Sequence, residues 1–328
     1  MHSLNVVSKG RSALSKAGPA TARHPRFDQG TRPAILAGVL ALAIWIGSEP
    51  GTAGETGVPT VVSPTVADTK DAKPWQRIVL VGASVSAGFT ESEPLGGKLT
   101  PMFRLHRYFD AALPSPHDPI QNQASPFFFM QPEVQGKAQI EAAIQARATL
   151  VVGIDFLFWY VYGKSESEDA RLAKLETGLE LLDSLHRPLV IGDIPDASVA
   201  TNSLLRVEQV PSHEVMKQAN QRITAWAADR PDVVVLPLAR FMADVLAKRP
   251  LTVHGFTQPA EAVPSLLQDD RLHPSPAGCA VLTLAILDQV QARWPGLGPT
   301  DVRWNPNEVR RLVLHPPEKG KASEPGLP

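Results

Sequence analysis

The stretch that decides the fold is IVLVGASVSAG, residues 78–88. Apolar residues run without a break up to Gly82, and a turn of small residues with two serines follows. A continuous apolar run of this kind is typical of a strand buried on both faces of a parallel sheet. A serine on the turn after such a strand is held rigidly and exposed, and its N–H can help to hold an oxyanion. Ser84 is therefore the candidate nucleophile.

Three more continuous apolar runs predict further buried strands. They are residues 149–154 (TLVVGI), 188–192 (PLVIG) and 233–237 (VVVLP). The segments between the runs carry helical patterns, and strands that alternate with helices imply an α/β fold with a mostly parallel, doubly wound sheet. In such sheets the ligand lies beyond the carboxyl ends of the strands, which is also where Ser84 falls.

Three of the predicted helices have a serine before their first turn, and serine is a preferred residue at helix N-termini. In the first of them the leucines recur at spacings of three and four, as on the buried face of a helix: Leu172, Leu175, Leu179, Leu182 and Leu185. The predicted helices are residues 172–185 behind a candidate capping box at Ser165-x-x-Glu168, residues 215–228 behind Ser212, and residues 277–290 behind Ser275-Pro276.

The last of these helices follows the stretch DDRLHPSPAG, residues 269–278. A serine hydroxyl is a poor nucleophile until a base takes its proton, and the base needs a carboxylate to fix its tautomer and stabilise the imidazolium. Asp270 precedes His273 by three residues on one loop, so its carboxylate can turn to the far imidazole nitrogen. Together with Ser84, these residues predict a Ser–His–Asp triad.

The two stretches resemble sequence blocks of the SGNH/GDSL family of serine hydrolases. Residues 82–88 (GASVSAG) are similar to the first block of that family, and residues 270–278 (DRLHPSPAG) are similar to its last. Residues 139–155 match the helix and strand that lead to the family's Gly-x-Asn-Asp block. The resemblance covers roughly residues 75–296. It implies a three-layer α/β/α sandwich (SGNH/flavodoxin-like) and hydrolysis of an ester or thioester through an acyl-serine intermediate.

The chain departs from the family pattern at two positions near the expected oxyanion hole. Ala83 stands where the family usually has Asp, and Asp155 stands where the family's Asn would donate to the oxyanion. An ionised carboxylate accepts hydrogen bonds, so only a protonated Asp155 could donate. Burial beside Phe156 and Trp159 would raise its pKa in that direction. The alternative is that Asp155 only holds its loop by hydrogen bonds.

A further oxyanion donor is expected from the family's second block. Residues 122–125 (NQAS) resemble its N-x-G-x-S pattern, with Ala124 in place of Gly. A backbone N–H survives a change from Gly to Ala where the conformation permits. The candidate donors are therefore the backbone N–H groups of Ser84 and Ala124, with Asp155 as the third candidate.

Flanking segments surround the domain expected at residues 75–296. Residues 1–53 hold a positively charged start and the uncharged run at residues 34–47, AILAGVLALAIWIG. This run is shorter than the about 20 apolar residues of a membrane-spanning helix and is typical of a secretory signal. Residues 54–74 are predicted to be a linker, and residues 297–328 a partly disordered extension. We expect an exported protein, periplasmic or extracellular, whose apolar segment is either cleaved or kept as an inner-membrane anchor.

Composition narrows the function. The formal net charge of −1 and the lack of a basic run argue against a nucleic-acid partner. The single cysteine, Cys279, excludes an internal disulfide, and we expect it to be a small buried residue.

The sequence predicts a carboxylic-ester hydrolase that needs neither metal nor organic cofactor and acts on a small-molecule, glycan or lipid ester. The alternative is an SGNH-like domain that binds a cell-envelope glycan or lipid without turning it over.

Overall fold

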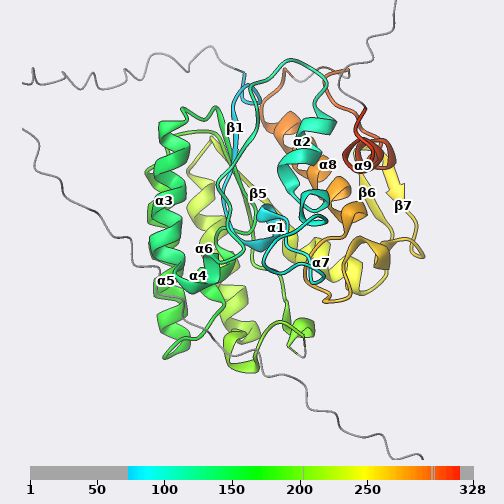
Figure 1. Ribbon diagram of the computed structural model, residues 1–328. Helices are drawn as coiled ribbons and strands as arrows, with labels where there is room; N and C mark the ends of the chain where they lie inside the picture. Colours follow the sequence, from blue (N-terminus) through cyan, green and yellow to red (C-terminus); the bar gives the residue numbers. More distant parts are fainter. Residues whose placement is uncertain (1–72, 202, 297, 299, 318–328) are drawn as a thin grey trace, which may run out of the picture. The chain divides into compact units, whose positions relative to one another are not determined.

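The computed structural model describes residues 73–201, 203–296, 298 and 300–317 (Figure 1). Within these residues one parallel sheet has five strands. In spatial order they are β2 (Gln121–Asn122), β1 (Ile78–Leu80), β3 (Leu150–Gly153), β4 (Leu189–Gly192) and β5 (Val233–Leu236). The order 2-1-3-4-5 is that of a flavodoxin-like, doubly wound fold. The predicted fold class is therefore confirmed.

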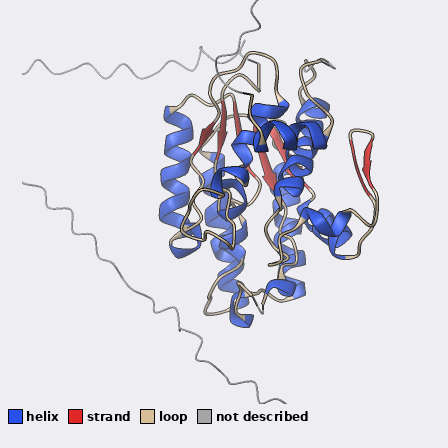
Figure 2. Cartoon of the chain, turned by 45° about the vertical axis from the view of Figure 1, so that its right-hand side comes forward, coloured by secondary structure: helices blue, strands red, loops and turns tan. Residues whose placement is uncertain are grey.

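Helices cover both faces of this sheet (Figure 2). Successive side chains of a strand point to opposite faces, so each strand contributes to two cores. Ile78 and Leu80 belong to one core, and Val79 and Val81 belong to the other. The first core is covered by α2 (Leu105–Ala112), α8 (Pro276–Arg293) and α9 (Pro306–Leu314), and the second by α3 (Pro132–Gln145), α5 (Glu168–Asp183) and α6 (His213–Ala228). This is the expected three-layer arrangement.

The four apolar runs of the sequence form β1, β3, β4 and β5. Ser212 and Ser275 cap α6 and α8 as predicted, because their side chains accept N–H groups of the first turn. The predicted cap of α5 was wrong by two residues: Ser167 accepts the N–H of Ala170 at 3.1 Å, while the hydroxyl of Ser165 donates to the carbonyl of Ser167. Cys279 is buried, as expected.

Shorter elements connect these layers. Three short helices begin beyond the carboxyl ends of strands, where ligands bind in this fold: α1 (Ser84–Ala87), α4 (Phe158–Val161) and α7 (Leu238–Leu246). A hairpin of β6 (Leu251–Val253) and β7 (Phe256–Gln258) follows α7. The 3₁₀ turns are η2 (Thr100–Met102), η3 (Phe128–Met130), η4 (Ser198–Ala200), η5 (Val207–Gln209) and η6 (Val263–Leu266).

The folded domain extends beyond its predicted end at residue 296. Val302, Val309 and Val313 are buried in the core that α2 and α8 share. The N–H of Arg303 also donates to the carbonyl of Ala112, at the end of α2, at 2.8 Å. Residues 302–314 of the predicted extension are therefore part of the helical layer.

Several sequence predictions fall outside the described residues. They are the signal or anchor at residues 34–47, the linker up to residue 72 and the tail from residue 318. Among the residues that the structure does describe, no helix is both long enough and apolar enough to cross a membrane.

Candidate active site

Ser84 and Asp155 lie close together beyond the carboxyl ends of two neighbouring strands. Ser84 opens α1 beyond the carboxyl end of β1, and Asp155 follows β3, which pairs with β1. The chain order reverses at this pair of strands, because β2 lies on the other side of β1. Such a switch point is where doubly wound folds bind their ligands.

The turn that carries Ser84 is fixed by Gly82 and by a buried glutamine. Gly82 has a φ of +125°, which favours glycine, and a Cβ at this position would overlap Oδ1 of Asp155. Gln139 of α3 reaches the turn with both ends of its amide. Its Oε1 accepts the N–H of Gly82 at 2.6 Å, and its Nε2 donates to the carbonyl of Gly82 at 3.0 Å. Gln139 therefore fixes the backbone from which the Ser84 side chain projects.

Asp270, His273 and Ser84 form one line of hydrogen bonds. Nε2 of His273 lies 2.8 Å from Oγ of Ser84, and its Nδ1 lies 2.7 Å from Oδ2 of Asp270. Oδ1 of Asp270 accepts the N–H groups of Leu272 (2.8 Å) and His273 (2.9 Å). Burial raises the pKa of Asp270, but these bonds and the attraction of His273 outweigh it and leave the pKa below its ordinary value. The structure thus brings the three predicted residues together.

Two residues that the sequence analysis did not single out support this line. The ring of Phe89 packs against that of His273, with the centroids 4.4 Å apart. Nε2 of Gln268 donates to the carbonyls of Phe89 (2.9 Å) and Pro274 (3.0 Å), and so joins the loops that carry Ser84 and His273. Phe89 and Gln268 are 179 residues apart, so no local pattern could reveal their contact.

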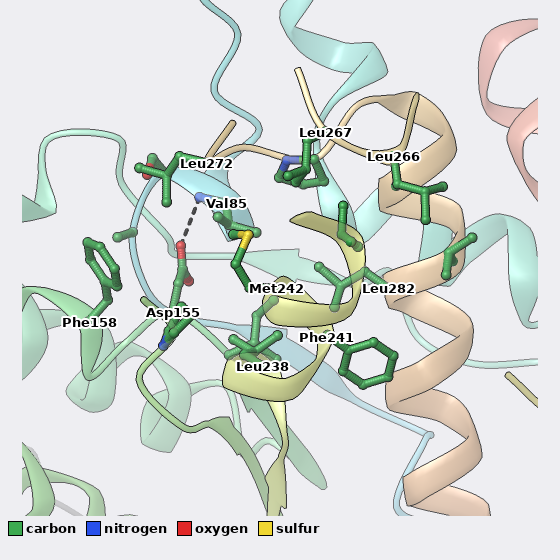
Figure 3. A pocket seen from close by; sticks show the side chains of 18 of the residues that line it. Val85, Asp155, Phe158, Leu238, Phe241, Met242, Leu266, Leu267, Leu272 and Leu282 are labelled. Carbon is green, nitrogen blue, oxygen red and sulfur yellow. Dashed lines mark hydrogen bonds between the residues drawn. The ribbon is translucent and has the colours of Figure 1, made fainter. Parts of the chain in front are cut away.

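Asp155 lies beside the Ser84 turn as an acceptor of hydrogen bonds (Figure 3). Its Oδ2 accepts the N–H groups of Val85 (2.8 Å) and Ser86 (3.2 Å), and its Oδ1 accepts the hydroxyl of Ser86 (2.6 Å). Burial raises the pKa of Asp155, and the hydrogen bonds from Ser86 and the turn oppose this without cancelling it. Backbone N–H groups can only donate, so Oδ2 has no proton to offer an oxyanion. The structure therefore favours the holding role of Asp155 over that of an oxyanion donor.

Ala124, the second oxyanion candidate, is bound within its own loop. Its N–H donates to Oδ1 of Asn122 at 3.0 Å, and Nδ2 of Asn122 donates to the carbonyl of Ser86 at 3.3 Å. The N–H of Ser84 is at the first position of α1, where no preceding helical carbonyl can accept it. Three oxyanion donors are predicted from the sequence. In this geometry, the N–H of Ser84 is the one that can donate a hydrogen bond to an oxyanion.

An apolar cavity opens beside Ser84 (Figure 3). Its empty volume is about 950 Å³, including open solvent at its mouth. Ser84 and Val85 line it from α1, and Leu238, Phe241 and Met242 line it from α7. The site therefore combines a hydrogen-bonded serine with space for an apolar group.

Comparisons with known proteins give likenesses of structure alone. No protein-family profile and no curated protein matches the sequence. The chain is similar to a solved lipase/acylhydrolase from Enterococcus faecalis, with 18% identity over 70% of this chain and 98% of the other, at a TM-score of 0.45. A GDSL-like lipase from Bacteroides thetaiotaomicron has 15% identity over 67% and 90% of the two chains, at a TM-score of 0.42. A catalytic mutant of an acetylxylan esterase from Geobacillus stearothermophilus has 16% identity over 66% and 94%, at a TM-score of 0.42.

Proposed function

We propose that this chain is a carboxylic-ester hydrolase that works through an acyl-serine intermediate. The observation that carries the proposal is the line of hydrogen bonds from Asp270 through His273 to Ser84, at 2.7 and 2.8 Å. A serine whose hydroxyl meets an imidazole, which in turn meets a buried carboxylate, is the arrangement that activates a serine nucleophile. Its place at the switch point of the sheet supports the same function.

In the proposed mechanism, Oγ of Ser84 attacks the acyl carbon while Nε2 of His273 takes the hydroxyl proton. Asp270 holds the ring through Nδ1 and stabilises the imidazolium. His273 then gives the proton to the leaving alcohol, and the N–H of Ser84 holds the oxyanion. A water molecule repeats the sequence on the acyl-enzyme and releases the acid. The reaction balances without a metal or an organic cofactor.

The test is hydrolysis of p-nitrophenyl acetate by residues 54–328 and their variants. We expect Ser84→Ala and His273→Ala each to lower kcat by at least about 10³-fold, and Asp270→Asn by roughly 10³–10⁴-fold. Ser184→Ala, at an exposed position at the end of α5, is the matched control and should keep the activity of the unchanged protein. Full activity in both Ser84→Ala and His273→Ala would contradict the proposal.

One observation favours a second function, binding of a cell-envelope glycan or lipid without turnover. The N–H of Ala124 is already bound to Asn122, and Asp155 accepts hydrogen bonds. The site thus has fewer oxyanion donors than the family pattern implies, and the loss of one donor costs about 2.7–4 kcal/mol in a serine hydrolase. A protein that binds such a ligand but shows no Ser84-dependent hydrolysis would support this function instead.

We also propose that the protein is exported. The uncharged run at residues 34–47, behind a positively charged start, supports this proposal. Residues 1–72 fused to a bacterial alkaline phosphatase should give activity in the periplasm, since this reporter is active only there. Leu40→Arg with Leu42→Arg should abolish that activity, because each arginine at the centre of such a segment costs about 2.5–3.5 kcal/mol of insertion free energy.

A further inference from the structure

We infer that the apolar cavity beside Ser84 binds the acyl chain of the substrate, and that this chain is an aliphatic chain well beyond acetyl in length. The inference rests on the proposed function, because it assigns one part of the ester to the cavity. It therefore predicts that the substrate is a medium- or long-chain acyl ester and not an acetylated glycan.

The first argument is the character of the cavity walls. Leu238, Phe241 and Met242 of α7, Leu267 after η6 and Leu282 of α8 line the cavity and are only partly buried. In Figure 3, Leu267 lies above α7 and Met242 points up from α7 toward Val85. A concave apolar surface left open to water is typical of a binding site for an apolar ligand.

The second argument is charge. Among the described residues that line the cavity there is no Lys, Arg or His. Its two carboxylates are already engaged by backbone donors: Asp155 by the N–H of Val85 at 2.8 Å, and Asp193 by the N–H of Ala239 at 2.7 Å. Most hydroxyl groups of a sugar would lack partners among these largely apolar walls, and unpaired buried polar groups are costly. A hydrocarbon chain needs no such partners.

The third argument concerns which half of the ester enters the cavity. Ser84 lines the apolar cavity, and in the intermediate the acyl carbon is bonded to its Oγ, so the acyl chain begins there. A second cavity beyond the other end of α1 is lined by Gly88, Arg104, His106 and Asn122, and Ser84 is not part of its lining. Its walls mix such polar groups with apolar residues, among them Phe89, Leu95 and Pro126, and so suit the leaving alcohol better than the apolar cavity does. The geometry thus assigns the apolar cavity to the acyl side.

The experiment compares p-nitrophenyl acetate, butyrate, octanoate and decanoate on residues 54–328. Burial of each methylene is worth about fourfold in kcat/KM, from about 0.8 kcal/mol per CH₂. We therefore expect kcat/KM to rise steeply from acetate to octanoate.

Met242→Trp narrows the cavity and should lower the ratio of kcat/KM for octanoate to that for acetate at least tenfold. Met130→Trp makes the same change at an exposed position outside the cavity lining and should keep the ratio.

Leu282→Trp narrows the cavity from α8 and serves as the second variant if Met242→Trp fails to fold. Ser84-dependent hydrolysis that favours acetate, with a ratio unmoved by both variants, would overturn the inference and leave the proposed function intact. A preference for long alcohol chains, measured with ethyl and octyl acetate, with none for long acyl chains would also overturn it.

Calorimetric titration with 1-octanol separates failure of the inference from failure of the function. If no ester is hydrolysed but 1-octanol binds, and Met242→Trp weakens this binding at least tenfold, the hydrolase function fails while the cavity still binds an aliphatic chain. If there is neither hydrolysis nor binding, both proposals are wrong.

Discussion

At the scale of single residues, the side-chain amide of Gln139 forms hydrogen bonds with the backbone of Gly82, as a neighbouring strand does elsewhere in the sheet. The carbonyl of Gly82 accepts the N–H of Ser125 at 3.1 Å, but β1 ends at Leu80 and the buried N–H of Gly82 needs a partner from outside the sheet. Gln139 supplies an acceptor and a donor from one planar group, at 2.6 and 3.0 Å. The position of the Ser84 hydroxyl thus depends on a side chain of α3.

Gln139→Leu keeps a side chain of similar size but leaves the N–H of Gly82 without an acceptor. We expect the free energy of unfolding to fall by about 2 kcal/mol, the cost of an unsatisfied buried donor. We also expect kcat on p-nitrophenyl esters to fall by roughly tenfold or more, because small displacements of a nucleophile slow catalysis strongly. Urea unfolding and initial rates measure both effects. Gln145→Leu, at an exposed position of the same helix, should change neither; equal effects of the two variants would contradict the role of Gln139.

The sequence could predict part of the site because some of its contacts are short in sequence. Asp270 and His273 are three residues apart on one loop, so their spacing alone indicates that they can meet. The contacts of Gln139 with Gly82 and of Asp155 with Ser86 span 57 and 69 residues. No spacing rule foresees such contacts, so the acceptor role of Asp155 needed the structure.

At the scale of elements, strands with a continuous apolar run are easier to predict than strands without one. The runs of β1, β3, β4 and the edge strand β5 are apolar because helices cover both faces of the sheet. The other edge strand, β2, is Gln121–Asn122, two polar residues without any apolar pattern. The helix α9 was missed because it is short and lies close to a tail rich in polar residues, although Val309 and Val313 have helical spacing.

Val309 tests the contribution of α9 to the domain. Its side chain is fully buried against the core that α2 and α8 share. We expect Val309→Ala to lower the free energy of unfolding by about 2 kcal/mol, from two lost methylene equivalents and the cavity left behind. Val134→Ala, at a position of α3 that is 64% exposed, should stay within about 0.5 kcal/mol. Chemical denaturation measures both, and an unchanged Val309→Ala protein would mean that α9 is dispensable.

At the scale of the whole described domain, two buried carboxylates give stability opposite dependences on pH. The folded-state pKa of Asp270 is lowered, so its contribution is present above the ordinary value near 3.8 and is lost as the pH falls through the folded pKa. The folded-state pKa of Asp155 is raised, so its contribution is lost as the pH rises from 3.8 through the folded pKa.

Asp270→Asn removes the first of these dependences. We expect the stability difference between the unchanged protein and Asp270→Asn to be largest near neutral pH and to shrink as the pH falls below about 4, where an unpaired carboxylate is protonated. Urea unfolding at several pH values between 3 and 7 measures this difference. Ser84→Ala keeps the carboxylate and should keep the acid dependence. A difference that grows toward low pH would contradict the lowered pKa.

The distance in sequence between Ser84 and His273, 189 residues, also determines when Ser84 can gain its proposed base. Synthesis delivers Ser84 and its turn early, while the acid–base pair emerges only after β5 and the hairpin that follows. A nascent or prematurely terminated chain therefore holds a serine without a base to activate it. In the proposed mechanism, ester hydrolysis begins only when α8 docks and brings His273 to the end of the first strand, so the chain is inactive while it is still on the ribosome.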